Sequence, residues 1–320
     1  MRATTQRVFV TGATGFLGRH LLPILSEARI SVRALARGAA GRELPAVPDV
    51  EWVSGDLMEV STFAPQLAGC HTLVHLAFPS GAPAAEQIRS ARSLAHAAVT
   101  SGVHRIVHCS TAIVAGRTRE RVVNERTRCE PRGKYEETKL LIEQVFQDET
   151  RGRAQLAILR PTAVFGPGGR NVVKIADQLR RNGALANWLR AALFGRRRLN
   201  LVSVSNVVEA LVFLVRRTQS EPTDVFIVSD DDDPANNYED VVALLRAQLG
   251  LRAARPPTLH VPVSGLSLLL RVLGRSSVDP DRIYDSSKLR DAGYKHSASV
   301  ASELTRFAAA YLRSYETAVR

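Results

Sequence analysis

The sequence predicts an α/β fold, a Rossmann-type doubly wound parallel sheet with a smaller mixed C-terminal substrate lobe. Short β-branched runs alternate with segments of helical apolar spacing through the first half of the chain, as right-handed βαβ crossovers require. A glycine-rich turn directly follows the first of these runs. With 320 residues, 45% of them hydrophobic, the chain is long enough for a nucleotide domain with an appended lobe.

The expected strands are short runs rich in β-branched residues. They cover residues 7–11, 31–36, 50–54, 72–77, 105–110, 155–159 and 225–229. Helical spacing is found over residues 18–28, 88–101 and 238–249. We expect a dinucleotide-binding domain over residues 1–165. Residues 166–320 would form mainly the substrate lobe, with some segments returning to the sheet. The acidic run at 230–233 is expected to be a solvated loop.

The formal net charge of +12 raises the question of a polyanionic partner. The basic residues are spread along the chain, with one tight cluster at Arg196-Arg197-Arg198, and no aromatic-rich nucleic-acid motif accompanies it. We therefore predict no nucleic-acid partner. A diphosphate-bearing cofactor and substrate explain the sign of the charge, and so does a merely soluble arginine-rich surface.

Cysteine usage and apolar segments bear on the compartment. Cys70, Cys109 and Cys129 are too few and too scattered for a disulfide framework or a metal site. Glycines follow the first apolar run so early in the sequence that no room remains for the apolar core of a signal peptide. The longest apolar stretch, Leu259–Leu270, is expected to be a buried or interfacial helix, because a bilayer span needs about 20 residues. We predict a cytoplasmic protein with no metal and no membrane span.

The first strand is followed by the turn TGATGFLG at residues 11–18. Gly12 permits a tight turn, Gly15 lets the backbone approach a pyrophosphate, and Gly18 allows close packing of helix on sheet. The N-terminus of the following helix faces the anion. At the first strand-to-helix turn of an alternating pattern, this spacing predicts a dinucleotide site.

The end of the second strand selects between the two nicotinamide cofactors. An acidic residue there accepts a hydrogen bond from the ribose 2′-OH and repels a 2′-phosphate. The sequence SVRALAR at 31–37 has no acid, and Arg37 follows the strand with Arg33 nearby. An arginine fork suits a phosphate, so NADP(H) is preferred, although NAD(H) stays open.

Tyr135 and Lys139 lie four residues apart on an expected helix, so both side chains share one face. An adjacent ammonium and an oxidised nicotinamide ring both favour the phenolate form of a tyrosine. The pair lies downstream of the glycine turn and of Ser110-Thr111, which end another predicted strand. This arrangement predicts a proton-transfer site.

These motifs together resemble the extended short-chain dehydrogenases/reductases, in their epimerase, dehydratase and ketoreductase branch. The similar segments are TGATGFLG, Asp56-Leu57, HLA at 75–77, CSTAIVAG at 109–116, YEETK at 135–139, LRPTAVFGPG at 159–168 and the late DSSKLRDAGY. The resemblance implies that Thr111 orients the substrate oxygen, that Tyr135 is the acid/base, and that Lys139 binds the nicotinamide ribose.

The resemblance also implies which residues hold the ligands. The cofactor would contact Gly12, Thr14, Gly15, Phe16, Leu17, Gly18, Asp56, Leu57, Leu76, Ala77, Ser110, Tyr135, Lys139, Pro161 and Val164, together with Arg37. The substrate would contact Phe78, Thr111, Tyr135, Asn171 and Arg198.

Some residues depart from the family pattern and bear on the substrate. Phe78 replaces the second alanine of the usual HLAA, Gln87 stands for an expected asparagine, and Ser205-Asn206 replaces an aspartate pair. The arginine that often contacts a sugar-nucleotide diphosphate is shifted to Arg198. His75 is interpreted as a structural residue.

The resemblance implies an enzyme, an NAD(P)-dependent oxidoreductase. Dehydration is disfavoured, because Thr111 is followed by Ala112-Ile113 and not by an Asp-Glu pair. We expect reduction of a ketone, with a nucleotide-linked 4-keto-6-deoxy sugar as first substrate. The alternatives are a nucleotide-sugar 4-epimerase with retained NAD, a reductase of a flavonoid-like or steroid-like carbonyl, and a non-catalytic cofactor sensor. A homodimer is kept among the candidate assemblies.

Overall fold

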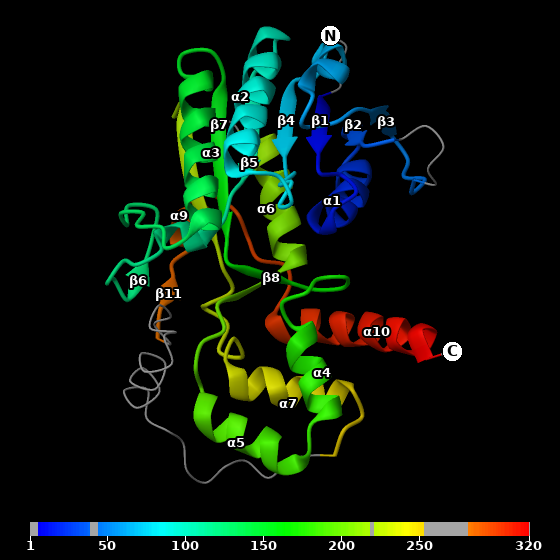
Figure 1. The fold of residues 1–320 in the computed structure, drawn as a ribbon, viewed down its shortest axis with the longest axis vertical. Coiled ribbons are helices and arrows are strands. Elements are labelled where there is room, and N and C mark those ends of the chain that lie inside the picture. The colour runs from blue at the N-terminus through cyan, green and yellow to red at the C-terminus, as the bar shows by residue number, and fades with distance from the viewer. Residues whose placement is uncertain (1–5, 39–43, 218–220, 253–280, 320) are drawn as a thin grey trace. The chain divides into compact units, whose positions relative to one another are not determined.

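The computed structural model describes residues 6–38, 44–217, 221–252 and 281–319 (Figure 1). Its main element is a seven-stranded parallel sheet in the order β10-β7-β5-β4-β1-β2-β3. The predicted Rossmann-type fold is confirmed. The strands are β1 (Arg7–Thr11), β2 (Ser31–Ala36), β3 (Val50–Ser54), β4 (Thr72–His75), β5 (Arg105–Cys109), β7 (Gln155–Pro161) and β10 (Thr223–Val228).

Several strand ends differ from the predicted ones. β4 ends at His75 and not at Ala77, and β5 ends at Cys109 and not at Ser110. β7 continues through Pro161, because a proline can end a strand where its missing N–H is not needed. The strand order reverses between β1 and β4, and ligands of such sheets bind at the carboxyl ends of the strands near this point.

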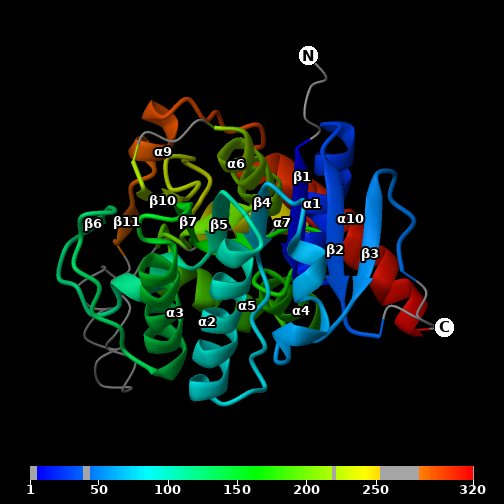
Figure 2. The same ribbon diagram turned by 90° about the horizontal axis from the view of Figure 1, so that it is seen from above.

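The helices α2 (Ala84–Thr100) and α3 (Lys134–Thr150) lie side by side on one face of the sheet (Figure 2). Their apolar side chains, including Leu94 and Phe146, form a buried core with side chains of β1, β4, β5 and β7. The helix α6 (Val204–Arg216) lies on the opposite face, and α1 is Phe16–Glu27. Short 3-10 turns are η1 (Val60–Thr62), η2 (Ala64–Leu67) and η3 (Ala112–Ala115).

The chain forms two compact units that alternate along the sequence. The first unit comprises residues 1–116, 129–160 and 207–226, and the second comprises residues 117–128, 161–206 and 227–320. Elements of the second unit are β6 (Val122–Val123), β8 (Ala163–Phe165), α4 (Val173–Arg181), α5 (Ala184–Phe194), β9 (Leu201–Ser203), α7 (Tyr238–Gln248), β11 (Ile283–Tyr284), α9 (Ser287–Asp291) and α10 (Val300–Val319).

The second unit has its own apolar core, to which α4, α7, β9 and α10 contribute. β8 pairs with β9, and β6 pairs with β11, both in parallel. None of the described helices combines the length and apolar composition that crossing a membrane requires. The predicted apolar helix at Leu259–Leu270 lies outside the described residues.

The acidic run after β10 is only in part the solvated loop that we expected, since Asp232 is exposed and the two acids before it are not. Asp230 and Asp231 are buried, and their carboxylates accept hydrogen bonds from the Ser203 amide and the Tyr284 amide, respectively, each at 2.8 Å. Burial raises the pKa of Asp230 to about 7 and that of Asp231 to about 6. For these two residues the prediction was wrong because the donors come from distant segments, which local composition does not reveal.

Candidate active site

The turn between β1 and α1 requires glycine at its first position. Gly12 has φ +73°, and a Cβ there would lie 2.7 Å from the backbone nitrogen of Ala77. The turn therefore touches the segment that follows β4, with no room for a side chain between them. Gly18 fits as closely, but against the turn itself and not the sheet, because its Cβ would lie 2.4 Å from the Gly12 and Ala13 carbonyl oxygens.

The N-terminus of α1 follows this turn without a protein group to cap it. Gly15 is the N-cap, no side chain caps the helix, and its first turn has no acidic residue. The Gly15 amide donates to the Gly12 carbonyl at 3.0 Å. Uncapped first-turn amides, here those of Phe16 and Leu17, together with the helix dipole form a site for an anionic group such as a pyrophosphate.

The predicted catalytic pair lies in the first turns of α3. The Lys139 ammonium is buried and donates a hydrogen bond of 2.9 Å to the Cys109 carbonyl at the end of β5. The side chain of Tyr135 is 47% exposed. The helix thus fixes the lysine against the sheet and leaves the tyrosine accessible to a ligand.

Phe78 contacts both members of the pair. Its ring lies edge-on to the Tyr135 ring at a centroid distance of 5.1 Å, and the Lys139 ammonium lies 5.1 Å from the Phe78 centroid. An aromatic ring thus borders the phenol in the position where the family pattern has an alanine. The contact with the ammonium is of the cation–π type.

The surroundings of Tyr135 favour its neutral phenol form. Burial, and to a lesser degree Cys109, raises the pKa of Tyr135 above its ordinary value. The lowering that we expected from Lys139 is not among the effects on Tyr135 in the chain alone. The ammonium donates to the Cys109 carbonyl and lies over the Phe78 ring. Tyr135 therefore carries its proton at neutral pH.

Two hydroxyls follow Cys109. The Oγ of Ser110 is buried and has no hydrogen-bond partner among the described residues. Thr111, also buried, is the N-cap of η3, which packs against α3. A buried hydroxyl without a partner has a free-energy cost, so Ser110 is suited to a ligand group at the carboxyl end of β5.

A known protein family matches the part of the chain that carries these residues. The model of the NAD dependent epimerase/dehydratase family matches residues 8–228. The chain belongs to this family. The match covers the turn at Gly12, Ser110-Thr111 and the pair on α3, within the extended short-chain dehydrogenase/reductase type that the motifs indicated.

The curated relatives have low sequence identity to this chain, and the similarity covers only part of each protein. The 4-hydroxy-2-methyl-3-oxo-4-farnesyl-3,4-dihydroquinoline-1-oxide ketoreductase of Stigmatella aurantiaca is 27% identical over 225 residues, which are 66% of this chain and 65% of that protein. The 3-beta-hydroxysteroid dehydrogenase of Mycolicibacterium neoaurum is 24% identical over 261 residues, 75% of this chain and 69% of that protein. The chain thus matches less than two thirds of the first relative.

Solved structures share the fold over almost the full length. MoeE5 in complex with UDP-glucuronic acid and NAD has a TM-score of 0.70 and 24% identity, over 96% of this chain and 99% of that one. The UDP-glucose 4-epimerase of Thermotoga maritima with UDP-glucose has a TM-score of 0.72 and 17% identity, over 97% and 100%. At these identities the likeness shows the fold of the family.

The two arginines expected near the adenosine end of a dinucleotide differ in whether protein groups already bind their guanidinium. Arg37 is exposed and has no hydrogen bond or ion pair with another described residue. Arg33 is committed elsewhere, because it donates to Glu51 at 3.0 Å and to the carbonyls of Gln66 and Ala68. Of the two arginines expected to bind a 2′-phosphate, only Arg37 is therefore available for it.

Asp56 and Leu57 follow β3 after one residue, Gly55. One carboxylate oxygen of Asp56 accepts from the Met58 amide at 2.9 Å. The side chain of Leu57 is buried, and its carbonyl accepts from Ser90. Leu76 and Ala77 adjoin Gly12, as described above. The backbone carbonyl of Thr14 accepts a hydrogen bond from Arg19 at 2.9 Å, and the Thr14 hydroxyl takes no part in this bond.

These residues fit a nicotinamide dinucleotide. The uncapped helix, the unpartnered hydroxyl of Ser110 and the exposed Arg37 offer donors for anionic and polar groups. The buried Lys139 has donors beyond its bond to Cys109.

The remaining predicted residues belong to the second unit. Pro161 ends β7 and Val164 lies in β8. Asn171 donates to the Val164 carbonyl at 2.6 Å. Arg198 is partly buried and donates to the Asp231 carbonyl at 2.8 Å, so part of its guanidinium already has a structural partner. Whether these four residues bind ligand stays a prediction.

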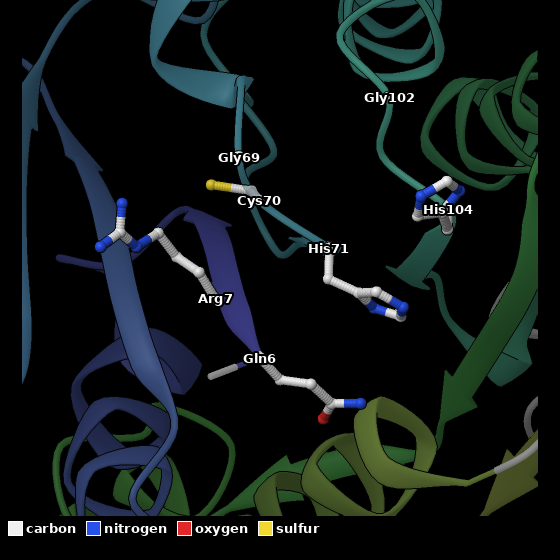
Figure 3. Close-up of a pocket in the computed structure, with 7 residues that line it drawn as sticks. All are labelled: Gln6, Arg7, Gly69, Cys70, His71, Gly102 and His104. Atoms are coloured by element: carbon white, nitrogen blue, oxygen red, sulfur yellow. The ribbon is translucent and has the colours of Figure 1, made fainter. Parts of the chain in front are cut away.

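A separate pocket of about 350 Å³ opens at the amino ends of β1, β4 and β5 (Figure 3). Arg7, His71 and His104 line it together with Gln6, Cys70 and two glycines, Gly69 and Gly102. The predicted catalytic pair is attached to the carboxyl end of β5, so this pocket is separate from it.

Proposed function

We propose that the protein is an NADP(H)-dependent reductase that converts a ketone to an alcohol. The observation that carries this proposal is the pair on α3, a protonated and accessible Tyr135 beside a buried Lys139 that is fixed at the carboxyl end of the sheet. A cofactor-sensing protein would not require an accessible proton donor at this point.

The chain's residues divide the chemistry between them. NADPH, when bound, supplies a hydride to the carbonyl carbon. Tyr135 donates its phenolic proton to the carbonyl oxygen, and the Thr111 hydroxyl orients that oxygen. Lys139, held by Cys109, binds the nicotinamide ribose, and its charge stabilises the phenolate that remains on Tyr135. Proton donation by a positioned side chain contributes about 10² to 10⁴ in rate.

The preference for NADPH rests on the end of β2. No acidic residue stands there to accept from a ribose 2′-OH, and Arg37 is exposed without a partner among the described residues. A net reductase exchanges its cofactor with a reduced pool, whereas an epimerase retains it. The same absence of an acid therefore favours reduction over epimerisation.

The first substrate candidate is a nucleotide-linked 4-keto-6-deoxy sugar. The motifs of the sequence and the folds of enzymes solved with UDP-glucose or UDP-glucuronic acid support it. A second candidate is a non-sugar ring ketone. Phe78, which borders Tyr135 and Lys139, offers an aromatic surface, and the relatives named above include a ketoreductase and a steroid dehydrogenase.

A panel of ketones from both classes, scored by NADPH oxidation, tests the proposal. We expect at least one to be reduced with NADPH consumption. Interconversion of 4-hydroxyl epimers of a nucleotide sugar without added cofactor would instead support the epimerase alternative.

Cofactor choice gives a first prediction. The protein should bind NADPH at least tenfold more tightly than NADH, because a charge-assisted bond from Arg37 to the 2′-phosphate contributes about 1.4 kcal/mol or more. Arg37→Ala should reduce this preference and leave NADH affinity unchanged. Titration by nicotinamide fluorescence measures both.

The matched control is Arg151→Ala, which removes the same charge from an exposed site just beyond the end of α3. Equal affinity of the wild type for both cofactors, or the same loss in Arg37→Ala and the control, would contradict the assignment.

A further inference from the structure

A second charged residue lies on the face of α3 that carries Tyr135 and Lys139. Tyr135, Lys139 and Glu143 are spaced by four residues, so their side chains share one face of the helix. Lys139 is bonded to Cys109 of β5. Glu143 is bonded to Arg160 of β7. Two successive turns of the helix are thus attached to two neighbouring strands near their carboxyl ends.

The bond between Glu143 and Arg160 is a buried bidentate ion pair. The guanidinium donates to the two carboxylate oxygens at 3.0 and 2.6 Å, and the side chains are 1% and 10% exposed. Two parallel charge-assisted bonds fix geometry as well as charge. The thiol of Cys129 lies beside the same guanidinium, and burial raises its pKa, so it adds no negative charge.

The other groups around the Lys139 ammonium are neutral. His75 and His108 stack on one another, and Lys139 acts on both. Burial lowers the pKa of His75 to about 3 and that of His108 well below its ordinary value. Burial also raises the pKa of the Cys109 thiol to about 11. Among the described residues that act on Lys139, Glu143 is therefore the one carrying a negative charge.

We propose that Glu143 is a positioning residue that acts through Lys139. Held by Arg160, it fixes the helical turn of the lysine and supplies the countercharge that keeps the ammonium protonated beside Tyr135. This inference rests on the proposed function, because it assigns Glu143 to that same site. It also accounts for a carboxylate that is buried one helical turn from a buried lysine. Burial lowers the pKa of Lys139, and Cys109 and then Glu143 oppose that effect.

A purely structural ion pair is the alternative, and the chain offers a matched example of one. Arg217 and Asp224 form an ion pair at 3.0 Å in the first unit, with side chains that are 21% and 9% exposed. No described contact joins this pair to Lys139. Asp224→Asn therefore removes a similar carboxylate without removing the countercharge of the lysine.

The test is the titration of Lys139 itself. The chain has five lysines, Lys134, Lys139, Lys174, Lys288 and Lys295, so protein labelled with ¹³C at the lysine Cε position gives a spectrum simple enough to follow against pH. Lys139→Arg assigns its signal. We expect the Lys139 midpoint to fall by about one pH unit in Glu143→Gln, as loss of a charge one helical turn away implies. Asp224→Asn should leave the midpoint in place.

If Glu143→Gln does not fold, the double variant Glu143→Gln with Arg160→Met removes both charges of the pair. Its Lys139 midpoint should also fall, because Glu143, and not Arg160, is among the groups that act on Lys139. A midpoint that stays at the wild-type value in the folded variant, with only the unfolding temperature lowered as in Asp224→Asn, would reduce the pair to a structural role and overturn the inference.

This experiment needs neither cofactor nor ketone. A panel in which no ketone is reduced would defeat the proposed function and leave the titration result intact, whereas an unmoved midpoint would defeat the inference alone. Where a reduced ketone is found, the alkaline limb of kcat/KM should shift to lower pH in Glu143→Gln as well.

Discussion

Tyr135→Phe is expected to lower turnover by about a hundredfold or more and to leave NADPH affinity within a few-fold of the wild type. The variant keeps the ring that packs against Phe78 and removes only the proton donor, which contributes about 10² to 10⁴ in rate. Turnover is measured with the ketone that the panel identifies, and affinity by nicotinamide fluorescence.

Tyr315→Phe is the matched control, because it removes a partly exposed phenol on α10. It should leave both quantities unchanged. A near-normal rate in Tyr135→Phe would show that another group donates the proton, and the site on α3 would then be wrong.

Gly12→Ala is expected to weaken NADPH binding by about a hundredfold. The added methyl would lie 2.7 Å from the backbone nitrogen of Ala77, so the turn after β1 and the segment after β4 have to separate. A left-handed backbone adds about 1–2 kcal/mol of strain for a residue other than glycine. Affinity is measured by titration, and stability by thermal unfolding.

Gly69→Ala separates these two effects. Gly69 has φ +76°, close to the +73° of Gly12, but a Cβ there meets nothing within 4 Å. The control should therefore lose stability through backbone strain and keep its affinity for NADPH. Equal affinities in the two variants would mean that the close approach at Gly12 does not shape the cofactor site.

The sheet could be predicted from the sequence because its strands are short, nearly continuous apolar runs. β1, β2 and β3 have the predicted bounds. Most residues of β1 and β2 are buried, and such parallel strands carry their signal within a few residues. The ends of β4 and β5 were less predictable. After β4 the next residues, Leu76-Ala77, are as apolar as the strand, and after β5 the prediction ran one residue too far, to Ser110.

Contacts between distant residues were not predictable in the same way. Glu143 looks like an ordinary helix residue until Arg160 is placed against it. Arg33 looks as free as Arg37 until its carbonyl partners are known. In the sequence Asp230 likewise looks like a surface acid, although it is buried in the structure. A buried charge is recognised by its partners, and for these residues the partners lie far away in the sequence.

For the predicted site residues, one part of the geometry is local and could be predicted, and another part depends on packing. The spacing of Tyr135 and Lys139 is a property of one helix, so the sequence was sufficient to place them on one face of α3. The bond from Lys139 to the Cys109 carbonyl depends on the packing of α3 on β5. The raised pKa of Tyr135 depends on the burial that this packing produces.

The fate of the hydride tests the central claim most directly. Purified protein is given NADPH that carries deuterium at the transferred position, together with the ketone that the panel identifies. The account predicts one NADPH oxidised for each alcohol formed, and one deuterium on the carbinol carbon of the product. An alcohol epimer formed without net NADPH oxidation and without deuterium, by protein that retains its cofactor through washing, would contradict it.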